Sequence, residues 1–173
     1  MKDPLNEPEL ETLDLKDDGV IPNSRFPLVH YRQAVRIAAA PDPASIFETL
    51  FSQNQWTGSW RNGVYSYHHY HSKAHEVLGV YSGSAQIRFG GESGRTVKVQ
   101  AGDAVVIPAG VAHKKLEASS DFAVVGAYPT GQSAEIREGK KEERPAADKE
   151  LQEVPRPALD PLYGESGPLL ELW

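Results

Sequence analysis

The chain contains no cysteine among its 173 residues. This absence excludes disulfides, thiol nucleophiles, iron–sulfur clusters and zinc sites built from thiolates. Any metal ion would therefore have to be held by nitrogen and oxygen ligands. A chain without cysteine is also compatible with a reducing compartment.

Long apolar runs and blocks of basic residues are also missing. No apolar stretch is long enough to span a bilayer, and the N-terminus, MKDPLNEPEL, lacks the apolar region of a secretory signal. The formal net charge is -6, and no cluster of lysine and arginine resembles a phosphate-binding stripe. We therefore expect a cytoplasmic protein whose partners are neither nucleic acids nor membranes.

The length fits a single domain over residues 1–173, and no internal repeat suggests a second one. Turn-forming residues mark 1–25 as an N-terminal arm, and prolines mark 131–173 as a C-terminal tail with a solvated charge run at 138–144. Residues 26–130 would form the core. Within it, residues 42–53 predict one helix, because Asp42 suits the N-cap, Pro43 suits the first turn and apolar residues follow at helical spacing.

Short runs rich in valine, isoleucine and aromatic residues alternate with glycine-containing turns after this helix. They predict strands near 64–71, 75–81, 84–89, 95–100, 104–107, 112–117 and 122–128. This pattern is typical of an all-β sandwich or barrel. The segment 26–31 is a further strand candidate. Trp56 and Trp60 are expected to pack beside the helix, and the terminal residues LLELW on the barrel or on a partner subunit.

Four of the six histidines lie within residues 67–76, in YHHYHSKAHE. Alternation along a strand would place His69 and His71 on one face with Tyr65 and Tyr67, and His68 and His75 on the surface or in an interface. Glu76 would face the two imidazoles from the returning strand. With His113 from a later strand, three imidazoles and one carboxylate could bind one divalent ion of Fe, Mn, Ni or Zn.

The spacing Gly63-x5-His69-x-His71-x4-Glu76-x6-Gly83 resembles the first cupin motif, and Gly102-x5-Pro108-x-Gly110-x2-His113 resembles the second. The stretches SWRNGVYSYHHYHSKAHEVLGVYSG and PAGVAHKKL are similar to the YjlB-type bacterial single-domain cupins. The resemblance implies an RmlC-like jelly-roll β-barrel with a central metal ion bound by His69, His71, Glu76 and His113. The second motif usually ends in asparagine, where this chain has Glu117.

Three roles are compatible with this sequence. The first is a metal-dependent enzyme, an oxidase, dioxygenase or isomerase, that acts on a small polar metabolite. Its candidate catalytic residues are Tyr67, Lys115 and Glu117, which together with Tyr65 would shape the pocket, since alternation places Lys115 and Glu117 on the face of His113. Lys115 could be an anion anchor inside the barrel or a charge at its rim. The second is a small-ligand-binding or sensing protein without turnover; a purely structural metal is a third reading. A homodimer is the default assembly.

Overall fold

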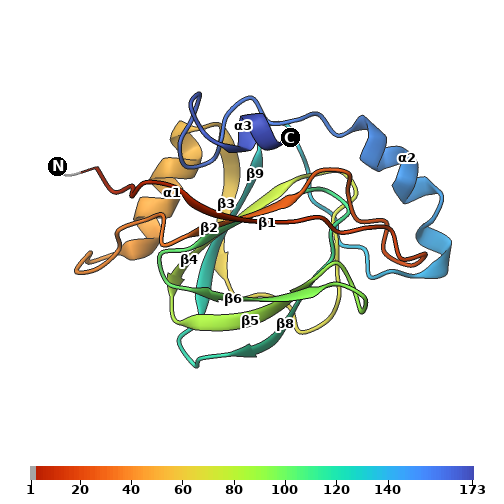
Figure 1. Cartoon of the computed structure of the whole chain (residues 1–173), viewed down its shortest axis with the longest axis horizontal. Helices are drawn as coiled ribbons and strands as arrows, with labels where there is room; N and C mark the ends of the chain where they lie inside the picture. Colours follow the sequence, from red (N-terminus) through yellow and green to blue (C-terminus); the bar gives the residue numbers. More distant parts are fainter. Residues whose placement is uncertain (1–2) are drawn as a thin grey trace.

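Two antiparallel sheets form the body of the protein. The computed structural model describes residues 3–173. Within this range the strands are β1 (Glu9–Leu13), β2 (Leu28–Arg32), β3 (Trp56–Asn62), β4 (Glu76–Ser82), β5 (Ser84–Phe89), β6 (Arg95–Gln100), β7 (Ala104–Ile107), β8 (His113–Ala118) and β9 (Ala123–Pro129). The larger sheet has the order β1-β2-β7-β4-β9-β3, and the smaller has the order β6-β5-β8 (Figure 1). The predicted all-β class is confirmed.

The two sheets enclose one apolar cluster. Alternate residues of β4, such as Leu78 and Val80, point into this interior and meet Ile87 and Phe89 from β5. Glu76 occupies the same face of β4 as Leu78, because side chains two positions apart on a strand share a face. The alternation predicted for β4 therefore places its single carboxylate at the interior end of the barrel.

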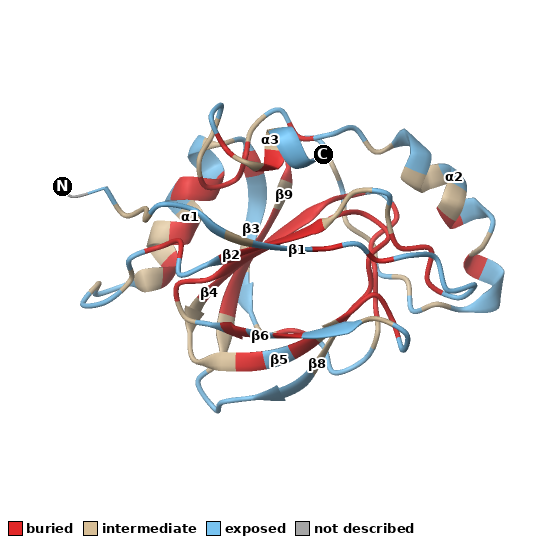
Figure 2. Cartoon of the chain, in the orientation of Figure 1, coloured by how far each residue is buried: buried red, intermediate tan, exposed pale blue. Residues whose placement is uncertain are grey.

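A second apolar cluster covers the outer face of the larger sheet. Helix α1 (Pro43–Gln53) lays Phe47 and Phe51 on this face, and Trp56 packs with them. Figure 2 shows buried segments in α1 and in the central strands of this sheet. Asp42 is the N-cap residue, as predicted, although its side chain makes no capping hydrogen bond. The contact with the sheet is close, since a side chain at Gly79 would lie 2.3 Å from the Phe47 ring. The central strands of the larger sheet, β2, β7, β4 and β9, are thus buried on both faces.

The arm and the tail are more structured than the sequence suggested. The arm contributes β1, which pairs with β2. The tail contains a 3-10 helix, η1 (Lys141–Glu143), and two α-helices, α2 (Ala146–Glu153) and α3 (Leu169–Leu172). The charge run at 138–144 is not simply solvated, because the carboxylate of Glu143 is buried and accepts the N–H groups of Gly139 and Lys140 at 2.6 and 2.7 Å.

The C-terminal residues dock on the same chain. The ring of Trp173 stacks on that of Phe26, with 5.2 Å between the ring centroids. The indole N–H of Trp173 donates to the carbonyl of Pro27 at 2.8 Å. No helix within residues 3–173 has the length and apolar character needed to cross a membrane. The domain limits, the homodimer and the cytoplasmic location stay predictions.

The strand predicted at 64–71 is wrong. Pairing with β9 begins earlier, in β3, and the segment from Gly63 to His75 is a loop that makes only isolated bridges, His69 to His113 and Tyr70 to Arg137. The alternation of tyrosine and histidine that suggested a strand therefore lies in an irregular segment. Trp60 was expected beside the helix, and this expectation is wrong. Trp56 faces the helix on the outer face of the sheet, whereas Trp60 lies on the opposite face and packs against the interior cluster.

Candidate metal centre

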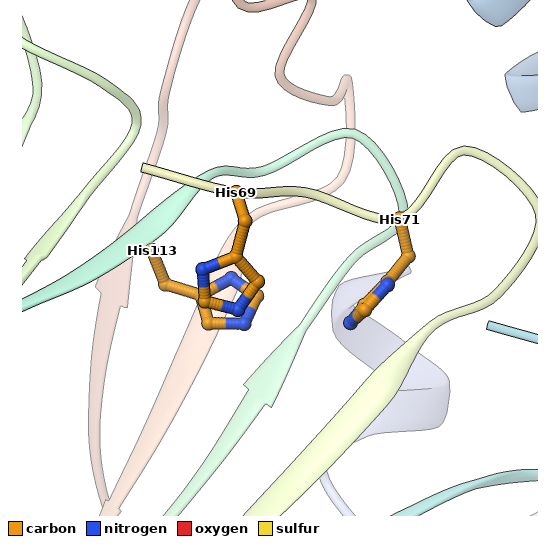
Figure 3. A group of neighbouring side chains, drawn as sticks. All are labelled: His69, His71 and His113. Atoms are coloured by element: carbon orange, nitrogen blue, oxygen red, sulfur yellow. The ribbon is translucent and has the colours of Figure 1, made fainter. Parts of the chain in front are cut away.

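Three segments bring the four predicted ligands together at one end of the interior. His69 and His71 lie on the loop between β3 and β4, Glu76 is the first residue of β4, and His113 is the first residue of β8. The loop is fixed to β8 by two hydrogen bonds: the N–H of His69 donates to the carbonyl of His113 at 3.3 Å, and the reverse bond measures 2.9 Å. Figure 3 shows the rings of His69 and His113 beside each other, with His71 further along the loop.

The turn before β8 delivers His113 to this point. Gly110 has a φ of +96°, and a side chain there would lie 2.3 Å from the carbonyl oxygen of Asn23. Only glycine tolerates both conditions without strain. The N–H of Gly110 also donates to the carbonyl of His71 at 2.8 Å. The glycine of the second motif therefore links the turn to the loop that carries the other two imidazoles.

The predicted ligands form a tight, buried group. One nitrogen from each of His69, His71 and His113 lies within 4.8 Å of the others. The carboxylate of Glu76 joins them, with one oxygen 3.5 Å from Nε2 of His71 and the other 3.2 Å from Nε2 of His113. All four side chains belong to residues that are at most 8% exposed. The structure thus brings together every residue predicted to bind the metal ion.

The second nitrogen of each imidazole faces a backbone carbonyl. The Nδ1 atoms of His69, His71 and His113 lie 3.1, 2.5 and 3.3 Å from the carbonyl oxygens of Tyr67, Glu135 and Val111, respectively. A carbonyl oxygen only accepts hydrogen bonds, so in each neutral ring the proton belongs on Nδ1 and the Nε2 lone pair is left open. Metal-binding histidines in proteins are usually oriented in this way.

In these neutral tautomers the three imidazoles have no proton to donate toward Glu76. Two open Nε2 lone pairs face the oxygens of Glu76, and an arrangement of acceptors facing acceptors is unfavourable unless a cation lies between them. Three imidazole nitrogens and one carboxylate are a suitable donor set for a divalent ion such as Fe, Mn, Ni or Zn. The residues present therefore fit the metal ion that the cupin resemblance implies.

Without a metal ion, the close packing of these side chains shifts the pKa values of Glu76, His69 and His71. Burial would raise the pKa of Glu76, but, without a metal ion, hydrogen bonds from His113 and His71, which require a proton on the facing Nε2 atoms, outweigh burial and hold that pKa far below its usual range. Burial lowers the pKa of His69 to about 3, and His113 adds to this effect. Burial also opposes a charge on His71, but the Glu76 carboxylate prevails and raises the pKa of that imidazole. The centre thus keeps an ionised carboxylate that attracts cations.

The tail holds His71 in place, a contribution that sequence reasoning missed. Glu135, whose carbonyl meets His71, also accepts hydrogen bonds from the N–H and hydroxyl of Ser72 at 2.9 and 2.7 Å. Arg137 donates to the same hydroxyl at 2.8 Å and forms an ion pair with Glu150 of α2 at 2.9 Å. Only the charge run at 138–144 was expected to be solvated, and nothing in the sequence around Glu135 and Arg137 pointed to a loop partner.

An open cavity of about 450 Å³ leads to the four ligands. Its other lining residues are Trp60, Arg61, Asn62, Gly63, Val64, Tyr65, Leu78, Lys115, Tyr128, Ala134 and Ile136. Polar, aromatic and apolar groups thus converge on the candidate metal centre, as in sites that bind small molecules.

Tyr128 is a cavity residue that sequence reasoning did not single out. The indole N–H of Trp60 donates to its hydroxyl oxygen at 2.8 Å. Burial raises the pKa of Tyr128 above its usual range, and the Glu76 carboxylate raises it further. Alternation along β9 could have found it, because Val124 and Gly126 precede it on the inward face.

Two of the three predicted catalytic residues lie outside the cavity lining. Lys115 lines it, but Tyr67 is 40% exposed and stacks on Tyr65, which is the tyrosine that contributes to the wall. Glu117 is exposed as well. The expectation that Tyr67 and Glu117 shape the pocket is therefore wrong, and catalytic roles for them remain untested predictions.

A β-bulge explains the position of Glu117. Lys115 pairs with the buried Ile87, whereas Glu117 pairs with the exposed Gln86, and the register shifts by one residue between these pairs. The extra residue, Leu116, breaks the alternation that would have put Lys115 and Glu117 on the same face. A bulge of this kind is not visible in the sequence.

The remaining histidines occupy three different environments. His75, predicted at the surface, is buried: its Nδ1 accepts the N–H of Ala109 at 2.9 Å and its ring packs on Trp173. His68 is half-buried and lies 2.6 Å from the exposed carboxylate of Glu92. His30 is buried beside Asp103.

Comparison with known proteins agrees with this site. Residues 60–125, which contain all four ligands, match the model of the cupin domain. The chain is also 45% identical over 168 residues to the uncharacterized protein YjlB of Bacillus subtilis (strain 168), an alignment that covers 96% of this chain and 98% of that protein.

Solved structures that are similar to the chain include those of oxalate decarboxylase. One, of Bacillus subtilis oxalate decarboxylase at pH 4.6, is 17% identical with a TM-score of 0.40 and covers 68% of this chain. Another, of the substrate binding mode of oxalate decarboxylase, is 17% identical with a TM-score of 0.37. The chain spans 28% and 23% of these two proteins, so the likeness carries no argument about activity.

Proposed function

The chain belongs to the cupin family, and from this premise we propose that it binds one divalent transition-metal ion through His69, His71, Glu76 and His113. We propose further that it is a metal-dependent enzyme, an oxidase, dioxygenase or isomerase, whose substrate is a small polar metabolite. The fold alone does not support this, since one fold carries many functions. The support comes from the ligand group and its cavity.

One observation carries the proposal: three open Nε2 atoms and a buried carboxylate converge at the end of an open cavity. A divalent cation satisfies all of these acceptors at once. A purely structural metal site closes its coordination sphere and needs no cavity, whereas a catalytic site keeps an open position for water or substrate. The cavity of about 450 Å³ favours the second arrangement.

The bound ion would supply Lewis-acid or redox chemistry to a substrate oxygen. The residues of the chain would bind and orient that substrate. Tyr128 keeps its proton because its pKa is raised, and its hydroxyl oxygen accepts the Trp60 N–H, so its own O–H can donate to Glu76 or to a bound substrate. The apolar side chains of Leu78 and Ile136 would exclude water from part of the cavity.

The test is elemental analysis of protein purified without chelator and without affinity nickel. We expect about one Fe, Mn, Ni or Zn per chain, and loss of that metal in a His71→Ala variant. His68→Ala is the matched control, because His68 directly precedes His69 in the sequence but pairs with Glu92. Absence of metal from the wild type after reconstitution, or equal loss in both variants, would refute the metal site.

Turnover requires its own test. A redox-active metal directs oxygen-uptake assays toward small hydroxy acids and diketones, and zinc directs isomerase assays. Metal-loaded protein that binds such compounds without converting them would favour the alternative function, a ligand-binding or sensing protein.

A further inference from the structure

The cavity contains an ammonium group without a charged partner. Apart from the histidines, its charged lining residues are Arg61, Glu76 and Lys115. Arg61 is fully engaged, because its guanidinium binds Asp42 at 3.0 Å and Glu48 at 2.7 Å. Glu76 faces the imidazoles. Within residues 3–173, Lys115 forms no ion pair, although the structure contains ion pairs of other lysines with Glu138 and Glu150.

The backbone directs Lys115 toward the interior. It lies two residues after His113 on β8, and both pair with buried residues of β5: His113 with Phe89 and Lys115 with Ile87. Its N–H donates to the carbonyl of Tyr65 at 2.9 Å, which fixes the strand to the cavity wall. The side chain is half-buried. The β-bulge at Leu116 follows immediately and turns the next carboxylate, Glu117, outward, so it does not neutralise the lysine.

The charge of the loaded cavity would contrast with that of the whole protein. The chain carries a formal net charge of -6. A divalent ion with Glu76 and Lys115, by contrast, leaves the cavity positive. A concave site with charge of one sign concentrates ligands of the opposite sign, particularly where low-dielectric walls focus the field. The net negative charge of the chain would repel anions in general, so a positive cavity in it indicates a specific anionic ligand.

We propose that the cavity takes a small carboxylate with an oxygen on the adjacent carbon, and that Lys115 binds its charge. This inference rests on the proposed metal site, which would bind the second oxygen. A phosphate is usually held by several donors, such as arginine forks or a helix N-terminus, whereas one ammonium matches one carboxylate. The Tyr128 hydroxyl offers a further donor, and Trp60 and Leu78 provide apolar contact for the carbon skeleton.

Calorimetric titration of the metal-loaded protein tests this assignment with two probes of nearly equal size, glycolate and its neutral amide, glycolamide. We expect glycolate to bind at least about tenfold more tightly, because a hydrogen bond to a charged partner is stronger than a neutral one. Equal binding of the two probes, or no binding of glycolate, would overturn the proposal.

Two lysine variants identify the residue responsible. Lys115→Met removes the charge but keeps the length of the side chain, and we expect it to weaken glycolate binding about tenfold while the metal content stays unchanged. Lys114→Met is the matched control, because Lys114 pairs with Arg88 on the other face of β8 and should leave binding unaffected. Unchanged affinity in Lys115→Met would show that Lys115 does not bind the anion.

Metal content separates this proposal from the proposed function. If the wild type takes up no metal, the metal-dependent enzyme is refuted. Glycolate binding to that metal-free protein would still support the role of Lys115 if it weakens in Lys115→Met, and would refute it if it does not.

Discussion

The chain buries two histidine–carboxylate pairs that differ in how the carboxylate is satisfied. Asp103, in the turn before β7, lies 2.9 Å from Nε2 of His30. It also accepts the N–H and side-chain amide of Gln33 at 2.9 and 2.8 Å and the N–H of Gln100 at 3.1 Å. With these donors present, the pair needs no further ligand.

Glu76 has no comparable set of donors. Its oxygens face Nε2 atoms of His71 and His113, whose protons belong on Nδ1. A buried carboxylate of this kind calls for a cation, whereas that of Asp103 contributes to the stability of β2 and β7. The comparison teaches that a buried carboxylate close to an imidazole does not by itself identify a metal centre. The two pairs differ in whether hydrogen-bond donors already satisfy the carboxylate.

Replacing each carboxylate by its amide should distinguish the two pairs most clearly. With metal at about 1,000 times Kd, the metal-loaded wild type should gain about 4 kcal/mol of unfolding free energy, measured by urea unfolding with and without metal. Glu76→Gln should lose this gain, because it removes an anionic ligand, yet stay folded, because an amide can donate to the open Nε2 atoms.

Asp103→Asn should instead keep the full gain from metal and lose about 1–3 kcal/mol in both states, because one buried acceptor becomes a donor facing other donors. Loss of the metal effect in Asp103→Asn, or its survival in Glu76→Gln, would reverse the assignment of the two pairs.

His75 sharpens the comparison, since it is a buried imidazole without a carboxylate. Burial lowers its pKa from 6.5 to about 4. Between these values the unfolded state binds more protons, so unfolding free energy should rise with pH and be lost as pH falls from about 6.5 to about 4. The total is about 3 kcal/mol. Chemical unfolding across this range should show a flatter profile for His75→Gln; an identical slope in both proteins would contradict the prediction.

Removing the contacts by which the tail positions His71 should have a smaller effect. Arg137→Met releases Ser72 and Glu150, and with them the Glu135 carbonyl that orients His71. We expect metal affinity to fall by roughly 10- to 100-fold, measured by competition with a chelator. Arg144→Met is a matched control, because Arg144 pairs with Asp17 and Asp148. Equal losses in both variants would indicate a general effect of the tail.

His68→Ala should have the smallest effect of all. The carboxylate it contacts, Glu92, is 80% exposed, and such surface pairs contribute little. Metal content should stay unchanged, and thermal unfolding should show a change below about 0.5 kcal/mol. A clear loss of metal would mean that this neighbour supports His69 or His71.

The convergence of the four candidate ligands was predictable from the sequence, but most of their surroundings were not. Motif spacing identified His69, His71, Glu76 and His113 because their positions depend on local turns, such as the one at Gly110. The same alternation failed over 64–71, where a loop with two bridges replaces the predicted strand. Periodicity describes which face a residue would occupy in a strand, but not whether another strand pairs with it.

Long-range contacts and irregularities account for the other errors. Glu117 was assigned to the pocket because alternation assumes regular pairing, and the bulge at Leu116 breaks it. The support of His71 by Glu135 and Arg137 joins segments more than 60 residues apart. Tyr128 shared the inward face of a correctly predicted strand, so it could have been found from the sequence.

Gly126 offers a route by which relatives of this chain could diverge. A side chain there would lie 2.2 Å from the Trp60 indole, so even a methyl group would force that ring to move. Trp60 lines the cavity but binds no metal, so its displacement would reshape the substrate space while sparing the four ligands. A single small substitution at this position could therefore change which molecules are accepted, making Gly126 a starting point for evolution or engineering of new specificity.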